Sequence, residues 1–356
     1  MLGNFERKNK AIHGMRHVAL SYTLAFSLLG AYAQAASVFQ FPTANHTLLQ
    51  ENGDAHFFVG TPGRPWTAGS FGCVRSSGYQ FHEGADIRSI ARDKRNEPTD
   101  PVLCTADGWV VHTNRKAGLS NYGKYVVVGH KVEGLEIYSI YAHLSRVNDE
   151  WKPGKWIAKG AQIGIMGRTS NTRQRISKER AHLHFEITLL ANHEFPDFFK
   201  KKYPKGRNDH GIWNGQNLIG IDPAEVFRAQ AASPAGFKLR DYLREQAPLF
   251  KLRVHQTEFA WIKRYRPLIL RSPELSHEQV DGYEIAFNYG GLPYQLKPIA
   301  IENPPAGEPW ELIHVDESVY QKHPCRKLVI KTGAKWRLTA KGRQLIELLL
   351  FAADRP

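Results

Sequence analysis

The sequence predicts a mainly β protein, with an antiparallel β-sheet or sandwich domain over residues 66–228 and a C-terminal α+β domain over residues 237–356. In the first part, short β-branched runs alternate with glycine-containing turns, a pattern typical of antiparallel sheets. The clearest runs cover residues 125–128, 135–140 and 161–165. A length of 356 residues also favours two domains over one.

The C-terminal part contains signals of both strands and a helix. Residues 287–293 carry the turn residues of a hairpin, and residues 327–331 have the composition of a strand. Thr339 is a suitable N-cap for a helix that continues through residues 345–351. Before this part, residues 229–236 are rich in alanine, serine, proline and glycine, so we expect a linker there. The sequence after the linker shows no set of catalytic residues. Three alternatives stay open for this part: a module that binds a cell wall, a module that binds a partner, and a structural appendage.

The first 35 residues have the pattern of a secretory signal peptide. Basic residues precede an apolar stretch at residues 18–33, and residues 33–35 form an Ala-Gln-Ala cleavage sequence. An uncleaved anchor is the alternative, but the stretch is short and interrupted by serine and threonine. Met15 is an alternative start that gives a more compact basic region. We therefore expect an exported protein of the periplasm, the extracellular space or the cell envelope, with no membrane span after cleavage. Residues 36–65 would then be an N-terminal lead-in, a segment that precedes the first domain.

The formal net charge of +14 predicts attraction to polyanions. Nucleic acid is not the expected partner, because no nucleic-acid-binding module is recognisable. For an exported protein, an anionic cell wall or lipid surface fits this charge better. The alternative is a basic surface that only keeps the protein soluble.

Three short histidine-containing segments carry the chemistry of the chain. Their sequences are Phe-His-Glu-Gly-Ala-Asp at residues 81–86, Tyr-Ala-His-Leu at 141–144 and Ala-His-Leu-His-Phe at 181–185. Residues two apart on a strand share a face, so His182 and His184 would point into one cleft. On a helix they would diverge by roughly 200°. The sequence therefore favours a strand.

The first of these segments places His82 and Asp86 four residues apart. Gly84 between them disfavours a helix and leaves room for an ion close to the backbone. A helical His-Glu-x-x-His zinc motif is absent, because residue 86 is aspartate. Imidazole and carboxylate groups are the usual protein ligands of a catalytic zinc.

The order of these segments resembles the lysostaphin/LytM-type peptidoglycan metallopeptidases, peptidase family M23, over about residues 66–227. Four flanking segments resemble the sequences around the family's motifs. They lie at residues 76–82, 106–111, 159–164 and 221–223. The resemblance implies a twisted antiparallel β-structure with one Zn²⁺ in a groove. It implies that His82, Asp86 and His184 are the metal ligands, and that His143 and His182 are the unligated catalytic pair.

This resemblance implies a zinc-dependent endopeptidase that hydrolyses peptide cross-links of bacterial peptidoglycan, with zinc-bound water as nucleophile. Such water has a pKa near 7. One histidine can take its proton while another stabilises the oxyanion or protonates the leaving amine, and the sequence leaves open which does which. The alternative is a non-catalytic scaffold that activates another wall hydrolase. All five expected positions are filled, which favours the enzyme.

The three cysteines are interpreted in the light of export. Cys73 and Cys104 bracket the first ligand pair, so we expect a Cys73–Cys104 disulfide, with Cys325 left over. A zinc–thiolate site is disfavoured because no Cys-x-x-Cys spacing occurs. A Cys-His hydrolase built on Cys73 or Cys104 is a rival hypothesis, but it leaves the histidine segments unexplained.

Two segments depart from the family pattern. The usual small-residue approach to the His-x-His sequence is replaced by a basic stretch at residues 168–180, and an aromatic and basic stretch occupies residues 195–205. Arginine and lysine in these stretches are candidates for contacts with acidic stem-peptide carboxylates. The alternative is that both are solvated loops.

Overall fold

The computed structural model describes residues 37–61, 63–173, 175–301 and 307–353. The predicted signal peptide, residues 1–35, lies outside the described residues. Within the described ranges, no helix is both long and apolar enough to span a bilayer. The chain from Ala35 onward forms one compact unit.

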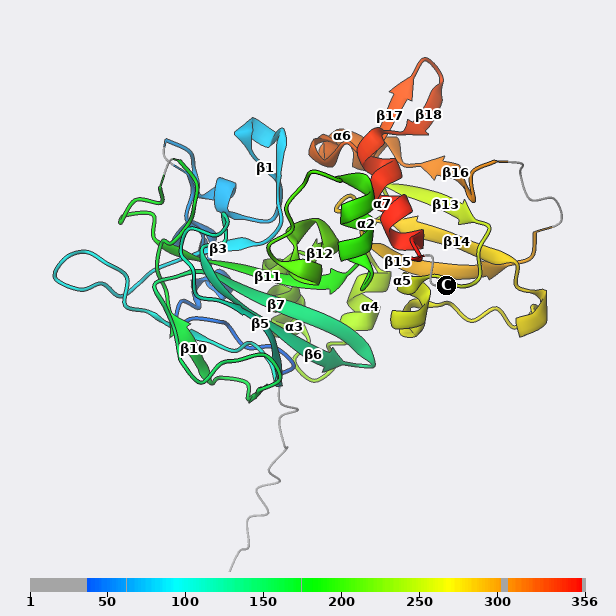
Figure 1. The fold of residues 1–356 in the computed structure, drawn as a ribbon. Helices are drawn as coiled ribbons and strands as arrows, with labels where there is room; N and C mark the ends of the chain where they lie inside the picture. Colours follow the sequence, from blue (N-terminus) through cyan, green and yellow to red (C-terminus); the bar gives the residue numbers. More distant parts are fainter. Residues whose placement is uncertain (1–36, 62, 174, 302–306, 354–356) are drawn as a thin grey trace, which may run out of the picture. The chain divides into compact units, whose positions relative to one another are not determined.

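The central element is a seven-stranded sheet in the order β12-β11-β7-β6-β5-β9, with β3 paired to β11. Every pairing in it is antiparallel, and the long strands lie side by side in Figure 1. Its strands are β3 (Ala85–Arg88), β5 (Gly108–Asn114), β6 (Lys124–Val132), β7 (Leu135–Leu144), β9 (Trp156–Ile157), β11 (His182–Leu190) and β12 (Leu218–Ile221).

The middle strands β6 and β7 pack against apolar side chains on both faces, which explains their β-branched runs. In β6, Val126 and Val128 pack into the main core, whereas Val127 lies in a second cluster with Ile140 of β7. This is the two-residue alternation of a strand covered on both sides. The predicted strands at residues 125–128 and 135–140 are therefore confirmed.

Two smaller sheets flank the central sheet. β4 (Pro101–Leu103), β10 (Gln162–Ile165) and β8 (Arg146–Val147) form one, so the predicted strand at residues 161–165 is also confirmed. β1 (Gly72–Arg75) and β2 (Gln80–His82) form a two-stranded hairpin. The helices of this part are α1 (Asp54–Phe57), α2 (Phe195–Lys202), α3 (Pro223–Ala232), and the 3₁₀ turns η1 (Thr47–Leu49), η2 (Trp66–Gly69), η3 (Ser76–Gly78), η4 (Gly211–Trp213) and η5 (Gly215–Asn217).

The C-terminal part has the predicted α+β character, built on a four-stranded sheet in the order β15-β14-β13-β16. Thr339 caps α7, because its Oγ1 accepts a hydrogen bond from the backbone N–H of Gly342. The elements are α4 (Leu239–Arg244), β13 (Phe250–Val254), α5 (Ala260–Arg264), η6 (Arg266–Leu268), η7 (His277–Gln279), β14 (Gly282–Phe287), β15 (Pro293–Ile299), β16 (Trp310–Val315), α6 (Glu317–Lys322), η8 (Pro324–Arg326), β17 (Val329–Thr332), β18 (Lys335–Leu338) and α7 (Ala340–Leu350).

The segment predicted as a linker, residues 229–236, is helical in its first half, because α3 continues to Ala232. The parts on either side of it share one hydrophobic core. Tyr265 Oη accepts a hydrogen bond from the backbone N–H of Leu190 at 2.8 Å, and the Asn192 side chain donates to the carbonyl of Leu348. The parts before and after the predicted linker therefore stabilise each other.

The predicted Cys73–Cys104 disulfide is wrong: Cys73 is bonded to Cys325. Cys104 is fully buried in the main core, where its thiol donates to the carbonyl of Ala106. Burial raises the pKa of this thiol to about 11. Cys325 belongs to η8, which packs on the β1-β2 hairpin. A partner 252 residues away carries no local signal in the sequence.

This disulfide is expected to stabilise the protein, because it closes a very long loop of the unfolded chain. We expect Cys325→Ser to lower the free energy of unfolding by roughly 2–5 kcal/mol, measured by urea denaturation. Reducing agent should destabilise the wild type similarly and leave Cys325→Ser unchanged. Three titratable thiols in the denatured, unreduced wild type would contradict the bond.

Candidate active site

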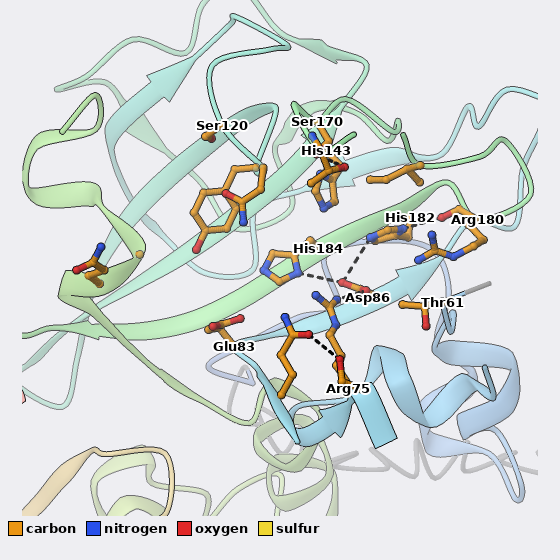
Figure 2. Close-up of a pocket in the computed structure, with 18 of the residues that line it drawn as sticks. Thr61, Arg75, Glu83, Asp86, Ser120, His143, Ser170, Arg180, His182 and His184 are labelled. Atoms are coloured by element: carbon orange, nitrogen blue, oxygen red, sulfur yellow. Dashed lines mark hydrogen bonds and ion pairs between the residues drawn. The ribbon is translucent and has the colours of Figure 1, made fainter. Parts of the chain in front are cut away.

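Five of the predicted site residues come together at one end of the central sheet. His82 ends β2, Asp86 lies in β3, and His182 and His184 begin β11. The pairing of β11 places His184 directly opposite Asp86 on β3 and opposite Ala142 on β7, so His143 is next to the cluster. Figure 2 shows the side chains of Asp86, His143, His182 and His184 facing one another.

The short connection between His82 and Asp86 depends on Gly84. A Cβ atom added to this residue would lie 2.4 Å from the backbone oxygen of Phe185 on β11. Only glycine permits so close an approach of the two backbones. His82 and Asp86 lie on separate strands, β2 and β3. Gly84 lets the turn between these strands pack against β11, which carries His184.

His82, Asp86 and His184 form a cluster that suits a metal ion, since one ligand atom from each lies within 4.8 Å of the others. The Nδ1–H of His82 donates to the carbonyl of Ser70 at 2.7 Å, which leaves Nε2 as the accepting atom, and in this structure Arg75 donates to it. His184 donates from Nε2 to Glu186 at 2.8 Å, and its Nδ1 lies 2.9 Å from Asp86 Oδ1. Two imidazoles and one carboxylate are a donor set typical of catalytic zinc.

The protonation of this cluster also fits a cation. Burial lowers the pKa of His184, but its hydrogen bonds to Asp86 and Glu186 outweigh burial and raise this pKa to about 9. Burial raises the pKa of Asp86, but electrostatic attraction to the His182 and His82 rings and to the Arg75 guanidinium, with the hydrogen bond from His184, holds this pKa well below its usual value. The ionised carboxylate shares a proton with Nδ1 of His184, at the position where a metal ion would replace that proton.

His143 and His182 form a second pair, whose ring centroids are 4.9 Å apart. The Nδ1–H of His182 donates to the carbonyl of Arg180, and that of His143 donates to the carbonyl of Thr169, so both Nε2 atoms keep a lone pair. Burial lowers the pKa of His182 to about 4 and that of His143 well below its usual value. Both rings are therefore neutral at pH 7 and able to accept a proton.

The backbone of His143 is strained. Its φ of 62° lies in the left-handed region, which a non-glycine residue rarely adopts. The position is the last but one of β7, where the chain turns beside β11. Strain of this kind is often found at functional sites, where the surrounding structure holds it in place.

Two residues that contact the cluster, Glu186 and Arg75, were not predicted from the sequence. Glu186 accepts hydrogen bonds from His184 and from Tyr122 Oη, and it orients the imidazole as a carboxylate beside a metal-binding histidine does. Strand alternation could have revealed it, because it lies two residues after His184. Arg75 donates to Asp86 Oδ2 at 2.6 Å and lies 2.8 Å from His82 Nε2, and no sequence signal indicated this.

The cluster opens into a groove of about 1220 Å³. Of the basic stretch at residues 168–180, Arg180 lines this groove, whereas Arg168 is paired with Glu97 outside it. The aromatic stretch at residues 195–205 forms α2, and its phenylalanines are buried in the core. A contact with substrate in the groove is thus available to Arg180 but not to α2.

A buried cluster of imidazoles and a carboxylate, placed at the end of an antiparallel sheet and open to a groove, is typical of a metal-dependent hydrolase. Residues 80–196 match the sequence model of peptidase family M23, which confirms the predicted resemblance over this segment. The match covers less than half of the chain. None of the curated proteins matches the chain.

Several solved structures are similar to parts of the chain. LytM from Ruminococcus gnavus is 28% identical over 30% of this chain and 39% of its own, with a TM-score of 0.22. Csd3 from Helicobacter pylori is 20% identical over 43% of this chain and 30% of its own, with a TM-score of 0.27. The lysostaphin catalytic domain from Staphylococcus simulans is 18% identical over 45% of this chain and 87% of its own, also with a TM-score of 0.27. The chain thus spans well under half of the length of the LytM and Csd3 structures.

Proposed function

We propose that this chain is an exported zinc endopeptidase that hydrolyses peptide cross-links of bacterial peptidoglycan. The observation that supports this most is that His82, Asp86 and His184 meet His143 and His182 beside one groove, which all of them except His82 line. The match of residues 80–196 to family M23 supports peptidase chemistry. The signal-peptide pattern of residues 1–35 supports a site of action in the cell envelope.

In this proposal His82 Nε2, Asp86 and His184 Nδ1 hold one zinc ion. When bound, zinc supplies Lewis acidity, which polarises a carbonyl and lowers the pKa of water. Glu186 keeps the His184 ring in the orientation that presents Nδ1. The ionised Asp86 contributes the negative charge that favours a cation over a proton at this position.

His143 and His182 act on protons in this proposal. Each is held by a hydrogen bond from Nδ1 to a backbone carbonyl and keeps Nε2 as the free basic atom. One neutral ring accepts the proton of the attacking water, and the other, once protonated, stabilises the oxyanion or protonates the leaving amine. Their short separation allows both to serve one scissile bond.

The groove supports a peptide substrate rather than a small molecule. It is large, and its polar walls include serine and asparagine side chains together with the guanidinium groups of Arg64, Arg75 and Arg180. These groups can bind carbonyl and carboxylate oxygens of an acidic peptide. Glu83, which lies across the cluster from Arg180 in Figure 2, gives the groove a negative group as well.

Digestion of purified peptidoglycan tests the proposal. The zinc-loaded full-length mature protein should release soluble fragments with new amino and carboxyl termini at the peptide cross-links, identified by mass spectrometry. The same protein carrying His182→Ala serves as the matched control and should release almost none. A zinc-loaded wild type that releases no fragments, but accelerates a separate wall hydrolase, would replace the enzyme by the activating scaffold.

A further inference from the structure

A second pocket, of about 470 Å³, adjoins the catalytic groove. The two cavities share a wall made by Gln80, Glu83, Gly215 and Gln216. The far side of the second pocket comes from the C-terminal part of the chain, mainly η8 and α7. A ligand that extends from the catalytic groove past Glu83 therefore enters a space formed by both parts of the protein.

Arg326 of η8 is the unusual group in this pocket. Its guanidinium stacks on the ring of Phe81, with 4.6 Å between Cζ and the ring centroid. Its Nε is buried without a hydrogen-bond partner, and none of the described residues forms an ion pair with it. Burial also lowers the pKa of Arg326. Arg326 is half-buried and lines the pocket, where an anionic partner would stabilise its partly desolvated charge.

The other charged groups at the pocket define what it can accept. Lys341 of α7 also lines it and adds a second positive charge. Glu83 is the opposing acidic group, but it lies beyond ion-pair distance of Arg326 and only attracts it through space. The apolar walls, which include Tyr79 and Leu345, suit the carbon skeleton of a peptide rather than a free inorganic ion.

The position of Arg326 is fixed by the chain on both sides of the pocket. The disulfide from Cys325, the residue before it, ties η8 to β1, and β1 pairs with β2, which carries Phe81 and His82. The register places Cys73 opposite Phe81 and Gly72 opposite His82. Arg326 is therefore anchored next to the strand that carries a metal ligand, which is the arrangement expected of a preorganised binding group.

We propose that this pocket is a substrate subsite in which Arg326, with Lys341 beside it, binds a free carboxylate of the peptide whose scissile bond lies in the catalytic groove. The planar guanidinium can take both carboxylate oxygens while it remains stacked on Phe81. This inference rests on the proposed peptidase function and adds a specificity to it. It also assigns a role in recognition to the C-terminal part of the chain.

The test compares two soluble cross-linked muropeptides that differ only in whether their free carboxylates are amidated. The wild type should cleave the carboxylate form with a kcat/KM roughly 10-fold to 100-fold higher, the scale of a hydrogen bond to a charged group. Arg326→Gln should lose this preference through KM while cleaving the amidated form as the wild type does. Arg326→Lys should keep part of the preference. Arg343→Gln, which removes a charge from exposed α7 surface, should keep all of it.

A binding measurement separates this inference from the proposed function. Calorimetry with the uncross-linked tetrapeptide of the same peptidoglycan, and with its amidated form, requires no cleavage. The wild type should bind the carboxylate form more tightly, and Arg326→Gln should bind both equally. If this holds while neither cross-linked substrate is cut, the peptidase proposal fails and the subsite stands. Equal binding of the two forms by the wild type, or a preference retained by folded Arg326→Gln, overturns the subsite.

Discussion

Replacing any one of His82, Asp86 and His184 by alanine is expected to abolish stoichiometric zinc binding and to lower peptide hydrolysis by about 10³-fold or more. Each replacement leaves two protein ligands where a catalytic zinc site needs three. The activation that the metal supplies amounts to several kcal/mol, and each 1.4 kcal/mol is a factor of ten in rate. Elemental analysis of the purified variants, with hydrolysis measured on the same samples, checks both parts of this prediction.

His193→Ala is the matched control for these variants, because His193 lies three residues beyond the end of β11, is exposed, and has its Nε2 3.8 Å from Glu194 rather than near the cluster. It should keep full zinc content and activity. Full zinc occupancy in folded His184→Ala would show that the ligand assignment is wrong.

Replacing His143 or His182 by alanine is expected to give a different result from replacing a metal ligand. Zinc is retained, and turnover falls by roughly 10²-fold to 10⁴-fold. That range is usual for the loss of a general acid or base. Both rings are hydrogen-bonded through Nδ1 to backbone carbonyls and neither belongs to the cluster of three ligand atoms. The loss should therefore lie mainly in kcat, measured on a soluble cross-linked peptide with saturating zinc.

The outcome for each variant identifies the role of its histidine. A variant that hydrolyses peptide almost as fast as the wild type would remove that histidine from the mechanism. A variant that loses its zinc would make that histidine a ligand instead. Circular dichroism of both variants should match the wild type, because the main core lies on the other side of β11, around Leu183 and Phe185.

The parts of the site that sequence analysis could predict are those governed by short-range geometry. His182 and His184 share a face because they are two apart on β11, and their apolar neighbours Leu183 and Phe185 are buried on the other face. The same alternation extends to Glu186, which was overlooked because it was not part of a recognised motif. The β-branched runs of β6 and β7 were predictable for the same reason.

The parts that could not be predicted depend on contacts between distant segments. The partner of Cys73 is decided by the packing of η8 on the β1-β2 hairpin, and sequence proximity favoured Cys104 instead. Arg75 reaches Asp86 because β1 pairs with β2, and neither short strand has a periodicity long enough to indicate that pairing. Residues 229–236 have the composition of a linker, but α3 extends into them because Val226 and Phe227 are buried in the shared core.

The most direct test of the assignment is anomalous diffraction at the zinc absorption edge from crystals of the zinc-loaded protein. We predict one strong peak, in contact with His82 Nε2, a carboxylate oxygen of Asp86 and His184 Nδ1, with His143 and His182 close by but off the metal. A peak bound by His143 or His182, or a principal zinc position elsewhere in the chain, would contradict the assignment of ligands and catalytic histidines.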